Sequence, residues 1–321
     1  MVRRRPDNGE WQLGLGMSHF YLGDLKMRAG DLDTALAHFR AYQQIAEKLV
    51  ATDPSNATYR LEQSYGHSNV AAIYQRQGNL QGAREQLQAV VRLQDELARQ
   101  RPDDQPLQTS RANSFNRLGI VEELAGDLAA ADQSFRQAVE LQEQLLQKSP
   151  RDMGLKRRRE VSLIYRGLVL RALGDASEAT RTLNAALTAT QELAALDATN
   201  ADWQRDLASA NNALSLIDID QGRAARAIER LRISRDIMMG LLKKAPARTT
   251  ELRDLASVYI RLAEAQRLTR DVPAAAEQLR LAQELLERLP EGQRDTETSR
   301  WLAAAHAESA AIAGAMQRPA Y

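Results

Sequence analysis

Cysteine is absent from the 321 residues of the chain, which excludes disulfide bonds and thiol chemistry. The chain also lacks any apolar run near the ~20 residues that a membrane-spanning helix needs. Its start, MVRRRPDNGEW, is basic, but no apolar segment follows, so a signal peptide is not predicted. Neither charge dominates, because 43 Lys and Arg face 42 Asp and Glu, which argues against a nucleic-acid surface. We therefore expect a cytoplasmic protein that binds neither nucleic acid nor a membrane.

Motifs for catalysis are missing as well. No G-x-x-x-x-G-K-[ST] loop occurs, and no G-x-G-x-x-G motif follows a predicted strand. His19 and His67 occupy one register of the chain, but no carboxylate or thiolate stands at ligand spacing, so they make a poor metal site. Glu122 and Glu123 are neighbours on a predicted helix and therefore point apart. We expect no enzyme activity, no cofactor and no metal.

What the sequence does contain is a repeat of 48 residues. In each copy, two amphipathic helical patterns meet at a short turn. The turns are Gly30-Asp31, Gly78-Asn79, Gly126-Asp127, Gly174-Asp175, Gly222-Arg223 and Arg270-Asp271. Five residues after the first residue of each turn stands an alanine: Ala35, Ala83, Ala131, Ala179, Ala227 and Ala275. A small residue at a constant place indicates two helices that approach closely.

Such a period predicts an all-α solenoid of antiparallel helical hairpins, because no single hairpin buries its own apolar face. We expect one domain over residues 1–321. The predicted repeats cover residues 9–56, 57–104, 105–152, 153–200, 201–248 and 249–295, and a last helix covers 296–317.

The third repeat resembles the tetratricopeptide repeat family. The matching residues are Phe115, Leu118-Gly119, Gly126-Asp127, Ala131, Phe135 and Ala138. The unit of that family has about 34 residues, so the repeat here is longer by about four helical turns. The resemblance implies a right-handed α-solenoid that binds a helix or an extended peptide of another protein in a concave groove. Repeats of this length are also similar to those that follow the kinase domains of some bacterial signalling proteins. That likeness implies a docking or sensory part of a longer protein such as a Ser/Thr kinase.

In that family the first helices line the groove, at positions 13, 10, 6 and 3 residues before each turn. Five of these positions form an apolar patch in the middle of the chain: Ile120, Ile164, Leu168, Leu216 and Ile219. Asn116 and Asn212 are polar candidates on the same face. Exposed apolar patches often mark binding sites, but curvature could instead bury these residues against neighbouring first helices. Both interpretations stay open at this point.

Three arginines on the same predicted face, Arg157, Arg205 and Arg253, stand 17 residues before their turns. Neighbouring helices pack ~8–10 Å apart, so the three guanidinium groups could form a ladder that binds an acidic extended peptide. In the alternative interpretation they are surface arginines. Arg157 would then pair with Glu160 and Arg205 with Asp202 in their own helices.

The first predicted helix, residues 10–29, is apolar for the end of a solenoid, which is normally polar. Its apolar residues are Trp11, Leu13, Leu15, Met17, Phe20 and Leu22. Residues 5–8 occupy the register of a linker between repeats, so an earlier repeat is one explanation. The other explanation is contact with another chain. It gives an alternative function, a self-assembly module that stacks through this helix.

Overall fold

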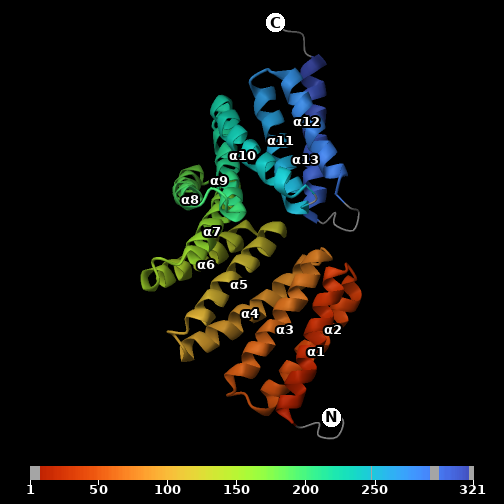
Figure 1. The fold of residues 1–321 in the computed structure, drawn as a ribbon, viewed down its shortest axis with the longest axis vertical. Coiled ribbons are helices and arrows are strands. Elements are labelled where there is room, and N and C mark those ends of the chain that lie inside the picture. Colours follow the sequence, from red (N-terminus) through yellow and green to blue (C-terminus); the bar gives the residue numbers. More distant parts are fainter. Residues whose placement is uncertain (1–7, 247, 290–295, 318–321) are drawn as a thin grey trace. The chain divides into compact units, whose positions relative to one another are not determined.

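A computed structural model of the chain describes residues 8–246, 248–289 and 296–317. Within these ranges all regular secondary structure is α-helical, in thirteen helices (Figure 1). The helices are α1 (Gly9–Arg28), α2 (Leu32–Thr52), α3 (Ala57–Arg76), α4 (Leu80–Gln100), α5 (Gln105–Leu124), α6 (Leu128–Lys148), α7 (Met153–Ala172), α8 (Ala176–Leu196), α9 (Ala201–Asp220), α10 (Ala224–Lys244), α11 (Thr249–Leu268), α12 (Val272–Glu287) and α13 (Thr296–Gln317). The predicted all-α fold is confirmed.

The helix boundaries follow the repeat. The first helices of the hairpins begin at residues 9, 57, 105, 153, 201 and 249, and the second helices begin at 32, 80, 128, 176, 224 and 272. Each series advances by 48 residues. The five turn glycines have φ angles from 70° to 86°, a left-handed conformation that glycine adopts without strain.

Side chains at the helix starts explain where the second helices begin. Asp31, Asn79 and Asp127 each accept a hydrogen bond from the backbone N–H three residues further on. Arg223 and Arg248, which precede α10 and α11, accept no such bond. α10 and α11 therefore begin without a side-chain cap.

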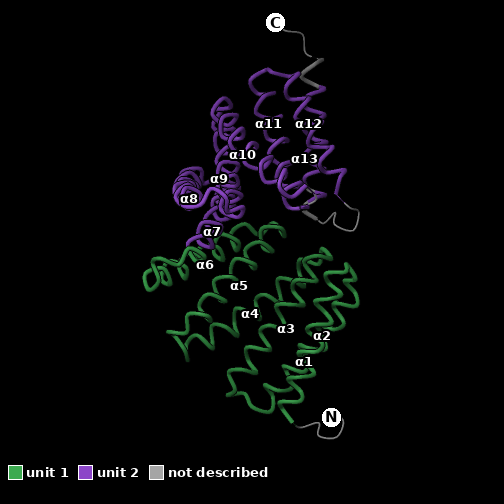
Figure 2. The backbone as a smooth tube through the Cα atoms, viewed as in Figure 1, with its two compact units in different colours: residues 1–155 green, residues 156–321 purple. Residues whose placement is uncertain are grey.

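The helices form two compact units, residues 1–155 (unit 1) and 156–321 (unit 2), coloured separately in Figure 2. In unit 1, α2 packs between α1 and α3, α4 packs between α3 and α5, and α6 packs against α5. In unit 2, α10 packs between α9 and α11, and α12 packs between α11 and α13. Stacked hairpins in both units match the predicted solenoid. That the whole chain forms one domain stays a prediction.

The alanine that follows each turn marks the tightest packing. All six of these alanines have 0% exposure. Four residues later stands a large apolar residue, such as Phe39 or Phe135, which is also fully buried. Its ring lies against a glycine of the first helix, because a Cβ added at Gly119 would lie 2.9 Å from Cζ of Phe135. In this hairpin, a small residue of the first helix thus lies against a large residue of the second helix.

Candidate interaction surface

We call the positions 13, 10, 6 and 3 residues before each turn the first-helix face. In unit 2 this face comprises Val161, Ile164, Leu168 and Arg171 of α7, Ser209, Asn212, Leu216 and Ile219 of α9, and Ser257, Ile260, Glu264 and Arg267 of α11. Four of the twelve side chains are buried, at 4–9% exposure: Ile164, Leu216, Ser257 and Ile260. The other eight are half-buried. None of the twelve is fully open to a ligand.

The predicted apolar patch is therefore largely part of the core of unit 2. Half-buried Leu168 packs against a buried cluster that contains Ile164 and Ile217. Half-buried Ile219 packs against a second cluster, which contains Leu262. This arrangement favours the alternative that curvature buries the patch against neighbouring helices, and little apolar surface remains there.

Ion pairs also join consecutive first helices across this face. Arg157 of α7 donates to Asp206 of α9, with Nε 2.5 Å from Oδ2. Arg171 of α7 donates to Asp220 at the other end of α9, again with Nε 2.5 Å from Oδ2. Both pairs are 49 residues apart in the chain. The separation is one repeat plus one residue, so these pairs link equivalent sides of two neighbouring helices.

Arg157 does not pair with Glu160, which was its expected partner. Glu160 is only 1% exposed and pairs with Arg159, whose Nη2 lies 2.8 Å from Oε1. Glu160 is buried between packed helices, whereas the guanidinium group of Arg157 reaches the first helix of the next hairpin, α9. Asp202 of α9 adds a second carboxylate, 3.4 Å from Nη1 of Arg157.

Arg205 does pair with Asp202, as expected, with Nη1 2.7 Å from Oδ1. It also donates to Glu251 of α11. Burial would raise the pKa of Glu251, but hydrogen bonds from Arg205 and Arg248 lower it below its usual value. Arg253 is half-buried and is not free of interactions either. Arg157 and Arg205 thus already join neighbouring first helices.

The first-helix face of unit 1 differs in its accessibility. It comprises Met17, Phe20, Asp24 and Met27 of α1, Tyr65, Ser68, Ala72 and Gln75 of α3, and Asn113, Asn116, Ile120 and Glu123 of α5. None of these twelve side chains is buried. Tyr65 is 46% exposed, and Asn113 is exposed as well. Asn116 and Ile120, which the sequence analysis selected, are half-buried.

One half-buried arginine joins α3 and α5 next to this face. Arg117 of α5 donates from Nη2 to the carbonyl oxygen of Ser68 at 3.0 Å and from Nη1 to its hydroxyl group. Burial lowers the pKa of Arg117. Tyr65 and Asn113 share the register of Met17 and were among the predicted groove positions, but they were not among the residues chosen as binding candidates. The 48-residue repeat identifies both positions in the sequence. Their exposure, however, depends on how closely neighbouring first helices approach.

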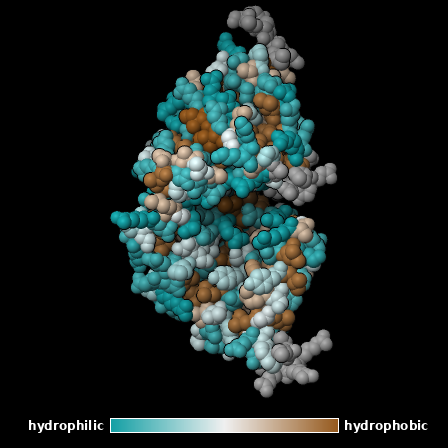
Figure 3. Space-filling model, in the orientation of Figure 1, coloured by the Kyte–Doolittle hydropathy of each residue, from teal (hydrophilic) through white to brown (hydrophobic). Residues whose placement is uncertain are grey.

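The apolar residues of α1 separate onto two sides. Phe20 packs against α2, with its ring centroid 6.3 Å from that of Phe39 and 6.0 Å from that of Tyr42. Leu22 and Leu25, in contrast, are 45% and 62% exposed. The visible face in Figure 3 is mostly hydrophilic and carries its apolar groups in separate patches. Leu22 and Leu25 are thus exposed apolar residues on the side of α1 away from Phe20.

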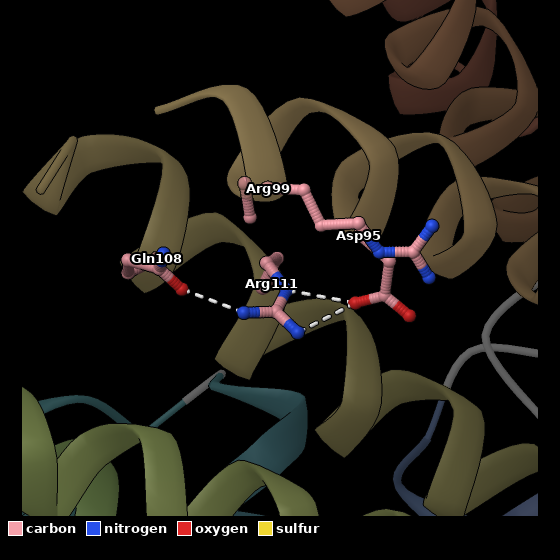
Figure 4. A pocket seen from close by; sticks show the side chains of 5 residues that line it. Asp95, Arg99, Gln108 and Arg111 are labelled. Atoms are coloured by element: carbon pink, nitrogen blue, oxygen red, sulfur yellow. Dashed lines mark hydrogen bonds and ion pairs between the residues drawn. The ribbon is translucent and has the colours of Figure 1, made fainter. Parts of the chain in front are cut away.

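A shallow hollow of about 270 Å³ lies between α4 and α5 (Figure 4). It is lined by Asp95, Ala98, Arg99, Gln108 and Arg111. The guanidinium of Arg111 donates to Asp95 at 2.9 and 2.6 Å and to Gln108 at 2.7 Å. Because these polar groups satisfy one another, the hollow joins two helices and offers a ligand little.

Three of the four histidines, His19, His38 and His67, lie within the hairpins of unit 1. Nδ1 of His19 lies 3.0 Å from Nδ1 of His38, and Nδ1 of His67 lies 2.7 Å from Oε1 of Gln86. Burial and the neighbouring His38 lower the pKa of His19. In the described part of the chain, no three His, Cys, Asp or Glu side chains are grouped to hold a metal ion. No helix there combines the length and apolar character needed to cross a membrane.

Comparison with known proteins agrees with this architecture. A model of the tetratricopeptide repeat matches residues 112–145, and no curated protein matches the sequence. The fold is similar to that of BtubC (BKLC) from P. vanneervenii, with 17% identity and a TM-score of 0.57 over 79% of this chain and 90% of that one. The apo form of RapI gives 12% identity and a TM-score of 0.59 over 93% of this chain and 99% of that one.

A Rap protein complexed with competence and sporulation factor gives 12% identity and a TM-score of 0.51, over 92% of this chain and 75% of that one. At these identities the likeness concerns the fold. The sequence thus contains a match to a tetratricopeptide repeat at residues 112–145, and the fold of the chain is similar to those of these helical-repeat proteins.

Proposed function

We propose that the chain is a non-enzymatic scaffold that binds a segment of another protein on the first-helix face of unit 1. One observation carries this proposal: none of the twelve positions of that face is buried and two of them, Tyr65 and Asn113, are exposed, whereas in unit 2 four of the twelve are buried and none is exposed. In unit 2 a ligand would also have to displace the ion pairs of Arg157, Arg171 and Arg205. A similar fold binds a peptide factor in the complexed Rap protein, which supports the same class of ligand here.

The accessible side chains suit a peptide backbone. Gln75 and Asn113 each carry a donor and an acceptor, so they can bind both the N–H and the C=O of an extended segment. The ring of Tyr65 offers apolar area with a hydroxyl group at its edge. An extended segment rises ~3.3 Å per residue, so neighbouring first helices ~8–10 Å apart would be reached by every third residue. We therefore propose an extended segment as the ligand, held by amide groups and by one aromatic contact.

Selection from a displayed peptide library against the full chain tests this function. Peptides that are enriched should bind the wild-type protein, and the pair Tyr65→Ala and Asn113→Ala should weaken them at least ~10-fold, about 1.4 kcal/mol. The matched control is the pair Ile233→Ala and Met239→Ala on α10, because those side chains are 49% and 48% exposed. Peptides that bind all three proteins equally, or no enrichment over a blank surface, would contradict the proposal.

Self-assembly is the second candidate, favoured by the exposure of Leu22 and Leu25 on α1. Sedimentation over a range of concentrations should then show an oligomer that dissociates on dilution. Replacing both leucines by glutamate should leave a monomer at every concentration. A wild-type protein that is monomeric throughout the range would remove this candidate.

The 48-residue repeat supports a finer proposal, that the chain is the cytoplasmic docking part of a bacterial signalling protein such as a Ser/Thr kinase. The reading frame around the coding sequence is the direct test. A kinase domain in the same frame would support the proposal, and an unrelated enzyme domain there would contradict it.

A further inference from the structure

The charge of α10 departs from that of the other second helices. α10 carries six Arg and Lys residues and two Asp and Glu residues. In α2, α4, α6, α8 and α12 the basic residues never outnumber the acidic ones. α10 lies inside the stack of unit 2 (Figure 1), because α9 carries α8 on its other side and α11 carries α12. Neither end of the chain therefore determines which side of α10 is exposed.

Three arginines at the start of α10 share a single carboxylate. Arg223, Arg226 and Arg230 lie 2.7, 3.7 and 2.9 Å from the carboxylate oxygens of buried Asp218. The other five hairpins have neither Arg nor Lys at these three positions. Positive side chains are unfavourable near a helix N-terminus, because the helix dipole is positive there. The start of α10 therefore has more positive charge than its own fold balances.

Further along α10, the basic side chains are exposed and unpaired. No carboxylate of the described residues pairs with Arg232, Lys243 or Lys244, which are all exposed. Of the two acidic residues of α10, Asp236 is already paired with the arginine before it. Glu229 is then the remaining negative charge of the helix. The exposed side of α10 is thus positive along its length.

Two neighbouring positions of α10 also lack the polar residues that the other second helices have there. Met239 is 48% exposed, and its equivalents are Glu47, Asp95, Glu143, Gln191 and Glu287. Gly240 is exposed, and its equivalents are Lys48, Glu96, Gln144, Glu192 and Arg288. Glycine weakens a helix, and a Cβ added at Gly240 would have nothing within 4 Å. Packing inside the described chain therefore does not require a glycine at this position.

We infer that the exposed side of α10 docks an acidic amphipathic helix of a second partner protein. This α10 surface comprises Arg226, Arg232, Ile233, Met239, Gly240 and Lys243. From residue 226 to residue 244 it is about 27 Å long, at 1.5 Å per residue. The charge of α10 selects a partner of opposite sign, and the exposed Ile233 and Met239 select one that also has apolar side chains.

Gly240 defines where the partner helix comes closest. Without a side chain at this position, a large apolar residue of the partner can reach half-buried Ile237, three residues earlier on the same side. Lys243 and Lys244 stand three and four residues after Gly240, so they border the same gap. Carboxylates beside the apolar residue of the partner would pair with these two lysines.

Other occupants match the α10 surface less well. A second copy that stacked α10 on α10 would bring like charges together. A membrane or a nucleic acid would place its phosphates against the exposed Glu229 and Asp236, and a nucleic acid would leave Ile233 and Met239 without apolar contacts. The α10 surface shares no residue with the site proposed on unit 1. The Ile233→Ala, Met239→Ala protein, which is a control for that site, is therefore a test protein for this one.

A displayed library of helical peptides serves as the probe for the full chain. Each peptide has about 20 residues, enough to span α10, with glutamate fixed on both sides of a stripe of randomised apolar residues. A matched library has glutamine at every glutamate position. Peptides of the glutamate library should be enriched and those of the glutamine library should not. The affinity of the enriched peptides should fall as the salt concentration rises.

Two variants test the residues that define the surface. Arg232→Glu with Lys243→Glu should weaken an enriched peptide at least ~10-fold. Gly240→Gln introduces the residue type that α6 has at this position, so it should raise the melting temperature and still weaken the peptide at least ~10-fold. The matched control is Gly14→Gln on α1, another exposed glycine with nothing within 4 Å of an added Cβ, which should leave the peptide affinity unchanged.

The pair Tyr65→Ala and Asn113→Ala should also leave the affinity unchanged, so failure of the site on unit 1 would not imitate failure here. Equal enrichment from both libraries, or equal affinity of the wild-type and Gly240→Gln proteins, would overturn the inference. No enrichment from either library would overturn it as well. If the wild-type protein then bound phosphatidylserine vesicles or formed a dimer, and the Arg232→Glu, Lys243→Glu protein did not, a membrane or a second copy would occupy the surface instead.

Discussion

Arg270 occupies the place of a turn glycine and has a φ of 66°. Asp271 still accepts a hydrogen bond from the backbone of Ala274, so the turn keeps its form. A left-handed residue other than glycine costs about 1–2 kcal/mol. The strain is local to the last hairpin of unit 2.

We expect Arg270→Gly to raise the free energy of unfolding by about 1 kcal/mol, because glycine removes the strain but adds freedom to the unfolded chain. Urea unfolding followed by circular dichroism would measure it. Gly126→Arg, at a turn with φ of 83°, should lower stability by a similar amount. An unchanged or lower midpoint for Arg270→Gly would show that the turn is not strained.

Glu160 is a buried carboxyl group at a position where other first helices have Gly16, Ser64, Ala112, Ala208 and Ala256. Its Oε2 has no hydrogen-bond partner. Burial raises the pKa of Glu160 to about 7, although the guanidinium of Arg159 opposes the shift. The folded protein therefore holds this proton more tightly than the unfolded chain does, and stability falls as pH rises from about 4.5 to about 7.

We expect Glu160→Gln to remove this part of the pH dependence. The loss in the wild-type protein between pH 5 and pH 8 should be at most about 3 kcal/mol, from ~1.4 kcal/mol per pKa unit. Thermal unfolding at both pH values would measure it, with Glu229→Gln on the exposed side of α10 as the control. If wild type and Glu160→Gln lose the same stability, Glu160 is charged in the folded protein.

At the scale of helices, the alanine after each turn sets how closely the two helices of a hairpin approach. Ala131 has 0% exposure, while Arg136 on the same helix is exposed. Ala131→Arg must separate α5 and α6 or bury an unpaired charge, so we expect a loss of about 3 kcal/mol or more. Arg136→Ala should change stability by less than ~0.5 kcal/mol. Similar melting temperatures for the two variants would contradict the packing described for this hairpin.

Most of this helix architecture was predictable from the sequence. The 48-residue step and the turn residues predict the helix starts, because both depend on local backbone preferences. The partner of Arg157 was not predictable in the same way. The expected partners were carboxylates of the same helix, whereas Asp206 lies 49 residues away and is brought near by the approach of α7 and α9.

The exposed face of α1 is an intermediate case. Leu22 and Leu25 occupy repeat positions that hold buried apolar residues in α3, α5, α9 and α11. The alignment of the repeats, which needs only the sequence, shows this correspondence. The apolar residues expected on this helix were not divided by side and included Phe20, which packs on α2. Which side of a helix is covered depends on the neighbouring helix, and composition does not report it.

At the scale of the whole molecule, the two units have different roles in this account. The first helices of unit 2 are joined to one another by ion pairs and buried side chains, whereas unit 1 keeps an accessible face. We propose that the partner protein binds to unit 1.

Hydrogen–deuterium exchange of the full chain, with and without a peptide from the library selection, tests this claim most directly. Binding slows amide exchange where it suppresses local opening. The account predicts slower exchange in α3 and α5, residues 57–76 and 105–124, with α9 and α11 unchanged. Protection confined to α9 and α11, residues 201–220 and 249–268, would place the ligand on unit 2 and contradict the account.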